Sequence, residues 1–499
     1  MRFRWRVPSV RCDNSWSIVV SLTESAELPQ NEFLAWFGVD SNMLARVLSA
    51  AMDRGADYAD LYFQHSQSNS LVLEDGIISR ASTGVDRGVG IRAVIGDQTG
   101  YAYSEDLSLQ PMLDAARTAA AIASGSRDVP PQALKHLSVP DQYPIEDPWD
   151  TVGVHSKLPL LRKTEAVVRG IEPAIRKVTV SWADSDERVL IATSDGTLAT
   201  DRRPMAYLSC RITAEQGGEM QSNGANLSRR NGIGWFTDER IQSVCQDAVD
   251  RTMILFEARR PPAGELPVVL AAGASGILLH EAVGHGMEAD FNRKGTSIYS
   301  TLLGERVAPD CVTIVDSALH PHERGALNMD DEGNATERTV LVEEGIMRSY
   351  LHDRISAEHY GVAPTGSGRR QSFRHVPMPR MRCTYMEPGE STRDEIIESV
   401  DHGIVAETFS NGQVQIGAGD FTFYIRNGWL IEGGKITAPI KDVNIIGNGP
   451  DAIRNITMVA NDMELDTGGW TCGKEGQSVP VSQGMPTVLV SQLTVGGEN

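Results

Sequence analysis

Near the middle of this 499-residue chain runs the segment Leu266-Pro-Val-Val-Leu-Ala-Ala-Gly-Ala-Ser-Gly-Ile-Leu-Leu-His-Glu-Ala-Val-Gly-His285. Its first five residues are apolar and include two β-branched valines, which predicts a buried strand. Glycines at positions 273 and 276 predict a tight turn, and Ile277-Leu-Leu279 predicts the start of a helix packed on the core. A strand-turn-helix unit holds the polar residues beyond its apolar run in fixed positions, so we expect a functional site there.

The polar end of the segment is His280-Glu-Ala-Val-Gly-His285. A hydrolytic zinc site needs imidazole ligands and a carboxylate that deprotonates a metal-bound water, and these residues supply both. In the common motif the histidines are four residues apart and share a helix face. Here they are five apart, which separates them by about 140° around a regular helix.

A local distortion of the helix would remove this difficulty. A π-bulge brings residues i and i+5 onto one face, and Gly284 and Gly286 would lower its backbone cost. We therefore expect a bulged or terminating helix at Gly284. A straight helix would instead favour the alternative, in which His280 and His285 are ordinary helix residues with satisfied hydrogen bonds.

A catalytic zinc ion takes three protein ligands and keeps one position open. Glu288 and Asp290 follow the motif closely and are candidates for the third ligand. Cys472 is another, because it lies in the glycine-dense stretch 466–480 before a final apolar strand, where a thiolate can approach a metal. A single cysteine is also often just a small buried apolar residue. Spacing along the chain does not decide among the three.

The motif and its continuation, Gly286-Met-Glu-Ala-Asp-Phe-Asn-Arg-Lys-Gly-Thr-Ser297, resemble the signature of the TldD/PmbA family of metalloproteases, in its metal-bearing TldD-type branch. Further segments resemble the same family, in order, from about residue 40 to the C-terminus. They are Asp57–Phe63, Leu73–Gly76, Gly88–Arg92, Asn328–Gly333, Pro364–Arg370, Met378–Met381 and Cys472–Pro480.

The resemblance implies a zinc-dependent peptidase of the HExxxH type. His280, His285 and Cys472 would bind one zinc ion per chain, and Glu281 would be the catalytic base that activates a zinc-bound water. The substrates would be short or unfolded peptides, in peptide maturation or degradation. The partner would be a TldE/PmbA-like subunit that lacks the motif, or a second copy of the chain.

Two other functions fit the same residues. One is a zinc-stabilised, non-catalytic peptide-binding subunit, although a structural zinc site normally has four protein ligands and only three strong candidates are present. The other is a metallo-amidase that acts on small molecules. A deep closed pocket would favour the amidase, whereas a long groove would favour peptides.

Composition restricts the class of protein. The net charge of −20 argues against a nucleic-acid binder. The longest largely apolar stretch, Leu266 to Leu279, is short for a membrane span. Six scattered cysteines without a CxxC pair indicate free thiols in a reducing compartment, so we expect a cytoplasmic protein. Arginines precede the short apolar run Ser17–Leu22, but no clean cleavage site follows, which favours a disordered extension or a misplaced start over a signal peptide.

We predict an α+β chain with N-terminal helix-sheet-helix lobes and a mostly β C-terminal catalytic domain that carries the HExxxH helix. The expected boundaries are 1–39 for the extension, 40–127 for the N-terminal domain, 128–258 for the central domain and 259–499 for the metalloprotease domain. Within them, helices are expected at 41–55, 107–124, 158–175, 237–258, 354–360 and 392–403. Strands with turns at 75–76, 96–97 and 194–196 are expected between the early helices.

Three further polar or glycine-rich segments each have two interpretations. Asp330-Asp-Glu332 is either an acidic turn of a hairpin or a cation site. Gly366-Ser-Gly-Arg-Arg370 is either a receptor for a substrate carboxylate or a structural loop. The segment Gly412–Gly419 is a strand that either pairs with an extended peptide or simply ends in glycines.

Overall fold

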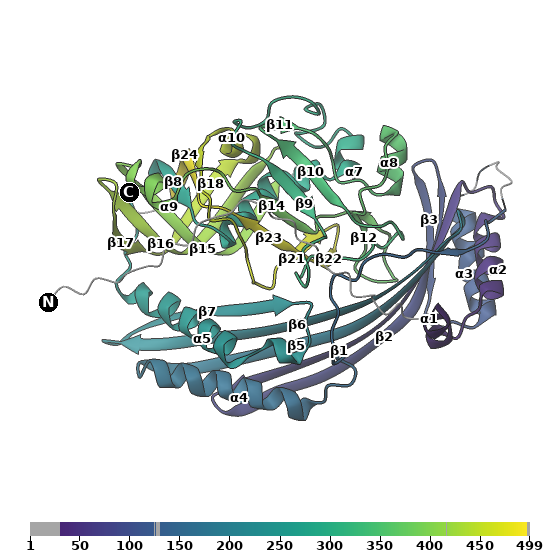
Figure 1. Cartoon of the computed structure of the whole chain (residues 1–499), viewed down its shortest axis with the longest axis horizontal. Helices are drawn as coiled ribbons and strands as arrows, with labels where there is room; N and C mark the ends of the chain where they lie inside the picture. Colours follow the sequence, from purple (N-terminus) through teal and green to yellow (C-terminus); the bar gives the residue numbers. More distant parts are fainter. Residues whose placement is uncertain (1–29, 124, 126–129, 416, 497–499) are drawn as a thin grey trace, which may run out of the picture.

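The computed structural model describes residues 30–123, 125, 130–415 and 417–496. A strongly curved, mostly antiparallel sheet supports helices on one face and the C-terminal half of the chain on the other (Figure 1). The apolar run Ser17–Leu22 and the arginines that precede it lie outside the described residues.

Long hairpins build the first sheet. Its strand order is β3-β2-β1-β5-β6-β4, and β7 pairs with β6. Asp75 and Gly76 both have positive φ, as a tight two-residue hairpin requires, so the predicted turn there is confirmed. The strands are β1 Tyr58–Glu74, β2 Ile77–Ile95, β3 Gln98–Ser104, β4 Lys135–His136, β5 Ile175–Thr193, β6 Thr197–Gln216 and β7 Glu219–Arg229.

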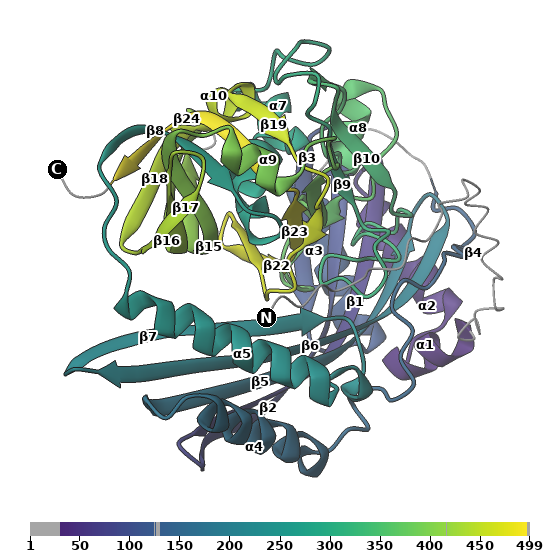
Figure 2. The ribbon, with the colours of Figure 1, turned by 60° about the vertical axis from the view of Figure 1, so that its left-hand side comes forward.

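Two groups of helices cover one face of this sheet, at opposite ends of β1 (Figures 1 and 2). The first group packs on Leu61 and Phe63, and the second packs on Leu71 and Leu73. Alternate residues of a strand share a face, so all four side chains point the same way. The first group is α1 Gln30–Phe37, α2 Ser41–Met52 and α3 Leu109–Ile122; the second is α4 Val154–Ile171 and α5 Asp238–Met253.

Two expectations for this half need correction. The predicted lobes do not have separate sheets, because β1 pairs with β5 along its whole length and joins them into one. The segment 30–39, expected to belong to a disordered extension, contains α1. Phe33 and Phe37 of that helix are buried in the core, so apolar packing orders this part of the chain.

The C-terminal half is mostly β, as predicted. One sheet has the order β15-β8-β24-β18-β16-β17, with β19 on β24, and a second has the order β11-β10-β9-β14-β23-β20. The strands of the first are β8 Gly264–Leu270, β15 His402–Gln415, β16 Asp420–Glu432, β17 Ile436–Ile440, β18 Val443–Asn448, β19 Ile456–Val459 and β24 Val488–Gly496. Those of the second are β9 Ile314–Ser317, β10 Arg338–Glu343, β11 Ile346–Met347, β14 Cys383–Met386, β20 Glu464–Leu465 and β23 Ser482–Met485.

Short helices and two hairpins complete this half. The hairpins are β12 Gly368–Arg369 with β13 Met378–Pro379, and β21 Thr471–Lys474 with β22 Gln477–Pro480. The helices outside the motif are α7 Ala289–Arg293, α8 Arg354–Tyr360, α9 Arg393–Glu398 and α10 Gly449–Arg454. The predicted helix 392–403 is too long. It stops at Glu398, because the β-branched residues from Ile404 onward pair with β8 instead.

Buried ion pairs join the two halves. Arg203 of β6 contacts Asp331 at 2.6 Å, Arg92 of β2 contacts Glu332 at 2.7 Å, and Arg370 contacts Asp60 of β1 at 3.2 Å. Asp331 and Glu332 of the acidic turn are therefore buried and paired with arginines. Buried Asp330 accepts hydrogen bonds from the backbone N–H groups of Glu332, Asn334 and Gly368, which favours the acidic-turn interpretation over a cation site. Arg370 pairs with Asp60 inside the protein, and neighbouring Arg369 donates to the carbonyls of Met381 and Pro480. Of the two interpretations of this loop, these contacts favour the structural one.

Within the part of the chain that the structure describes, no helix combines the length and the apolar character needed to cross a bilayer.

Candidate metal centre

The motif segment follows β8, which is flanked by β15 and β24 in the sheet. Val268 to Leu270 are buried, so the predicted core strand is confirmed. After a turn at Gly273, where φ is 76°, the chain enters α6 Ile277–Leu279. A π-helical turn follows at His280–Gly284, in which the N–H of His285 donates to the carbonyl of His280. The helix is thus bulged at Gly284, as the five-residue spacing predicts.

Gly284 and Gly286 are required for a different reason from the one expected. Gly284 has ordinary right-handed helical angles, φ −56° and ψ −55°, so the backbone does not need a glycine there. Packing needs it instead, because a Cβ on Gly284 would overlap the sulfur of Met381. A Cβ on Gly286 would lie 2.5 Å from the ring of Tyr299. The glycines let neighbouring side chains close over the motif.

Side-chain donors satisfy carbonyls around the bulge. The hydroxyl of Tyr299 donates to the carbonyl of Ala282 at 2.8 Å. The amide of Asn292 donates to the carbonyls of Gly286 and Glu288, each at 2.8 Å. Buried backbone carbonyls without partners would destabilise the fold, so these contacts stabilise the distorted segment.

His280, His285 and Cys472 come together. One donor atom from each lies within 4.8 Å of the other two, and this is the only group of its kind among the described residues. The Cys472 sulfur is 3.5 Å from Nε2 of His285, and all three side chains are buried. Burial alone would raise the pKa of the Cys472 thiol, but the adjacent imidazoles of His280 and His285 hold it well below its usual range. The arrangement favours a thiolate facing two imidazoles.

Cys472 lies on a strand, not on the irregular glycine-rich loop that we expected. It belongs to β21, the first strand of the hairpin with β22. Glu475 and Gly476 have φ of 48° and 75°, which makes the tight connection between the strands. Hydrogen bonds of the hairpin therefore fix the position of the cysteine sulfur.

Glu288 and Asp290 do not join the three donors. Oε2 of Glu288 is 3.0 Å from Nδ1 of His285 and 3.1 Å from Nζ of Lys474. Asp290 contacts Nζ of Lys474 at 2.7 Å. Burial would raise the pKa of Glu288, but Lys474 and His285 lower it to about 2. A carboxylate on Nδ1 orients a histidine so that Nε2 faces a metal, as in many metal sites.

The residues fit a bound metal ion in two further respects. Nδ1 of His280 is buried and has no hydrogen-bond partner among the described residues, which is costly unless something else binds that ring. Two imidazoles and one thiolate are also the donor types that zinc prefers. Glu281 is half-buried beside them and makes no hydrogen bond or ion pair within the described chain, so its carboxylate is available for chemistry.

Comparison with known proteins identifies the family of the chain. Three family models match in order: PmbA/TldA metallopeptidase domain 1 at residues 59–123, the central domain at 147–256 and the C-terminal domain at 263–497. The chain belongs to the TldD/PmbA metallopeptidase family. Its members' shared description as metallopeptidases is consistent with a metal centre in the C-terminal part.

Individual members of the TldD/PmbA family extend the comparison. A metalloprotease TldD homolog from Haemophilus influenzae is 41% identical over 477 residues, covering 94% of this chain and 99% of that protein. A zinc metalloprotease TldD homolog from Saccharolobus solfataricus is 29% identical, covering 91% and 99%. The crystal structure of TldE from Thermococcus kodakarensis has the same fold, with a TM-score of 0.70 at 18% identity, covering 91% and 100%.

Sequence reasoning missed Lys474. A signal for it exists, because residues two apart on a strand share a face and Lys474 follows Cys472 by two. That signal becomes useful only when the glycine-rich stretch is known to be a strand. Glu288 was a candidate ligand because it is close to the motif in sequence, but its carboxylate contacts Nδ1 of His285 instead of joining the three donors.

Proposed function

We propose that this chain is a zinc-dependent peptidase that hydrolyses short or unfolded peptides. The observation that supports this best is the buried group of His280, His285 and Cys472 next to Glu281, whose carboxylate has no partner among the described residues. Three protein donors leave one coordination position of a tetrahedral zinc ion open, which is typical of catalytic sites.

Each residue has a distinct role in this proposal. His280, His285 and Cys472 hold one zinc ion per chain, which when bound polarises the peptide carbonyl and makes water more acidic. Glu281 accepts the proton of the attacking water and then returns it to the leaving amine as a general acid-base. Glu288 orients His285 from the far side of the ring, and Lys474 balances the charge of Glu288.

An extended peptide suits the surroundings of the site. The strand β15 pairs with β16 up to Gln415, whereas β8 covers its other edge only from Ile404 to Ala406. Among the described residues no strand covers the rest of that edge, so its backbone groups can pair with a substrate backbone. This supports a peptide substrate over a small amide.

The working form in this proposal is a dimer, with a TldE/PmbA-like subunit that lacks the motif or with a second copy of the chain. The likeness of fold to TldE supports a common architecture for such a pair. The described cysteines are all free, which supports a reducing compartment such as the cytoplasm.

Replacement of Glu281 tests the proposal. Glu281→Gln should retain close to one zinc per chain and the same melting temperature but lose peptide hydrolysis by about 10²- to 10⁴-fold, because only the proton acceptor is removed. Metal analysis and a quenched-fluorescence peptide assay measure both quantities. Glu358→Gln, on the exposed surface of α8, is the matched control and should behave like the wild type.

The second candidate function, a zinc-stabilised peptide-binding subunit, predicts a different outcome for Glu281→Gln. In that case wild type and Glu281→Gln would bind peptide equally and neither would hydrolyse it, with or without the partner subunit. Turnover of small amides but not of peptides would favour the metallo-amidase.

A further inference from the structure

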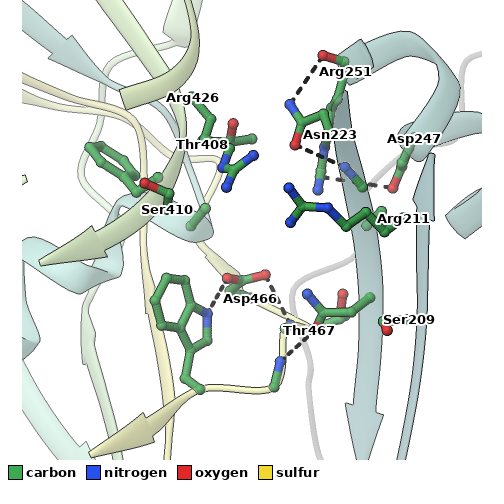
Figure 3. Close-up of a pocket in the computed structure, with 18 of the residues that line it drawn as sticks. Ser209, Arg211, Asn223, Asp247, Arg251, Thr408, Ser410, Arg426, Asp466 and Thr467 are labelled. Carbon is green, nitrogen blue, oxygen red and sulfur yellow. Dashed lines mark hydrogen bonds and ion pairs between the residues drawn. The ribbon is translucent and has the colours of Figure 1, made fainter. Parts of the chain in front are cut away.

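A second site lies between the first sheet and the C-terminal half. A cavity of about 450 Å³ opens there, within the range of roughly 300–1,000 Å³ that is typical of ligand pockets. The sheet contributes residues of β6 and β7, α5 contributes its C-terminal turn, and the other wall comes from β15, β16 and the segment 466–471 (Figure 3).

Two guanidinium groups face each other across this cavity. Arg211 extends from β6 and Arg426 from β16, and their ends point toward one another (Figure 3). Burial, followed by the like charge of Arg211, lowers the pKa of Arg426. Like charges at close range are unfavourable, so an anion between them would relieve the repulsion.

The protein does not itself neutralise these two arginines. Among the described residues, neither the exposed Arg211 nor the half-buried Arg426 forms an ion pair with a carboxylate. Arg251 in the same cavity is balanced by Asp247 at 3.9 Å. The carboxylate of Asp466 accepts hydrogen bonds from Trp470 and Gly468 of its own loop. A positive charge therefore remains available to a ligand.

The walls that carry the two arginines are fixed to one another. Asn223 of β7 donates to the side chain of Asn427 at 2.9 Å, and Asn427 donates to the carbonyl of Arg251 at 2.9 Å. Gly224, opposite Arg211 in the sheet, approaches the carbonyl of Cys210 so closely that a Cβ would lie 2.5 Å from it. The cavity is thus pre-organised, which reduces the entropic cost of binding.

Two segments connect the cavity to the metal centre. Trp470 and Thr471 line the cavity and Cys472 follows directly. Ala274 also lines it, six residues before His280, which is about 9 Å along a helical rise. An extended peptide spans roughly 3.3–3.6 Å per residue, so about three residues bridge the cavity and the centre.

We propose that Arg211 and Arg426 form a subsite that binds a carboxylate of the peptide substrate, in the cavity that adjoins the metal centre. The inference rests on the proposed peptidase function and adds a determinant of substrate choice. Arginine binds carboxylates through paired, charge-assisted hydrogen bonds, and two arginines on opposite walls suit a single carboxylate between them. The carboxylate is either the C-terminus of the peptide or an acidic side chain.

Peptide binding to zinc-loaded protein with Glu281→Gln, which prevents turnover, tests the subsite. Fluorescence anisotropy would compare three labelled peptides of equal length: a neutral peptide with a free C-terminus, its C-terminal amide, and the amide with one glutamate. At least one carboxylate-bearing peptide should bind roughly ten- to a hundredfold more tightly than the neutral amide. Which one does so identifies the source of the carboxylate.

Variants then assign the effect to the two arginines. Arg211→Gln and Arg426→Gln are each added to Glu281→Gln. Each should lower the affinity for the carboxylate-bearing peptide to that for the neutral amide, and the affinity for the neutral amide should not change. Arg211→Lys and Arg426→Lys should retain part of the preference, because they keep the charge without the paired geometry. Arg80→Gln, at an exposed position of β2, is the matched control.

Three outcomes would overturn the subsite. All three peptides could bind equally, none could bind, or the glutamine variants could lose the same affinity for the neutral amide as for the carboxylate-bearing peptides. Hydrolysis by the wild type is measured separately. Its failure would refute the peptidase and leave the binding comparison intact, whereas normal hydrolysis without a carboxylate preference would refute only the subsite.

Discussion

Three acidic residues within ten positions of sequence have different surroundings. Glu281 is half-buried and unpaired within the described chain, Glu288 contacts His285 and Lys474, and Asp290 contacts Lys474 only. The π-helical turn and the change of direction after Met287 separate them. In the proposed function these three carboxylates have three different roles: Glu281 transfers a proton, Glu288 orients His285, and Asp290 contributes to the charge balance of Lys474.

Loss of the charge at Glu288 should weaken zinc binding without abolishing it. We expect Glu288→Gln to lower zinc affinity by about 10- to 100-fold, since the carboxylate fixes the orientation of His285. Competition with a chromogenic chelator measures the affinity. Cys472→Ala, which removes a proposed ligand, should have a larger effect, and Asp290→Asn, which leaves His285 untouched, a smaller one. Equal affinity for Glu288→Gln and the wild type would contradict the orienting role.

The candidate site could be predicted in part from sequence. The spacing of His280 and His285 required a bulged helix, and the structure has one. Cys472 lies 187 residues beyond His285, and only the family resemblance connected the two. Lys474 was missed, because a glycine-rich stretch does not show by composition that it forms a hairpin strand.

At the scale of elements, the motif helix depends on how closely its neighbours approach. Gly284 lies against Met381, and a Cβ on Gly449 of α10 would lie 2.5 Å from the carbonyl of Ala282. The helix is thus surrounded by contacts that leave no room for added atoms.

Gly284→Ala should lower the free energy of unfolding by about 1–3 kcal/mol, because the new methyl group overlaps the sulfur of Met381. In a Met381→Ala background, Gly284→Ala should lower the free energy of unfolding by less than half as much. A double-mutant cycle from thermal melts would measure this difference. Gly170→Ala is the control, since Gly170 lies in α4 with open space at its Cβ. Equal costs in both backgrounds would attribute the effect to the backbone instead of Met381.

The N-cap of α8 should make stability depend on pH. Asp353 accepts a hydrogen bond from the N–H of Ser356, and burial followed by the nearby Glu332 raises its pKa to about 6. Because the folded-state pKa is raised, the stabilisation is complete below about pH 4 and is lost as pH rises through 6, by up to about 3 kcal/mol.

Asp353→Asn keeps a good capping residue and removes the charge, so its stability relative to the wild type should rise between pH 4.5 and 7.5. Melting temperatures across this range give the comparison. A constant difference between Asp353→Asn and the wild type at all pH values would refute the assignment.

Elements with strong local signals were predicted well, and those set by distant partners were not. The hairpin turn at Asp75-Gly76 and the helix ending at Tyr360 follow from local residues. The helix expected up to Gly403 instead gives way to β15, because Ile404 pairs with Val268 of β8, far away in sequence. Long-range pairing of this kind has no local signature.

At the scale of the whole molecule, buried ion pairs between arginines and carboxylates join the two halves. Removing one partner of such a pair leaves an uncompensated charge, which typically costs 3–5 kcal/mol. The division into domains between residues 127 and 128 and between residues 258 and 259 stays a prediction. The first two regions share a single sheet, so the boundary between them does not separate two independently packed units.

Assembly can be tested by counting zinc. A heterodimer with a motif-less subunit should contain one zinc ion per pair, whereas a homodimer should contain two. Light scattering combined with metal analysis distinguishes these states, and removal of zinc with a chelator should abolish hydrolysis in either. A monomer that is fully active at low concentration would refute both forms of dimer.

The pairing of β1 with β5 also has a consequence for biosynthesis. Asp60 pairs with Thr193 and Glu74 with Thr179, so more than 100 residues must be synthesised between the two strands. At a synthesis rate of roughly 5–20 residues per second, the edge of β1 that pairs with β5 stays unpaired for several seconds. A nascent chain truncated between β3 and β5 should therefore expose a long strand edge and aggregate, and this fold should mature slowly.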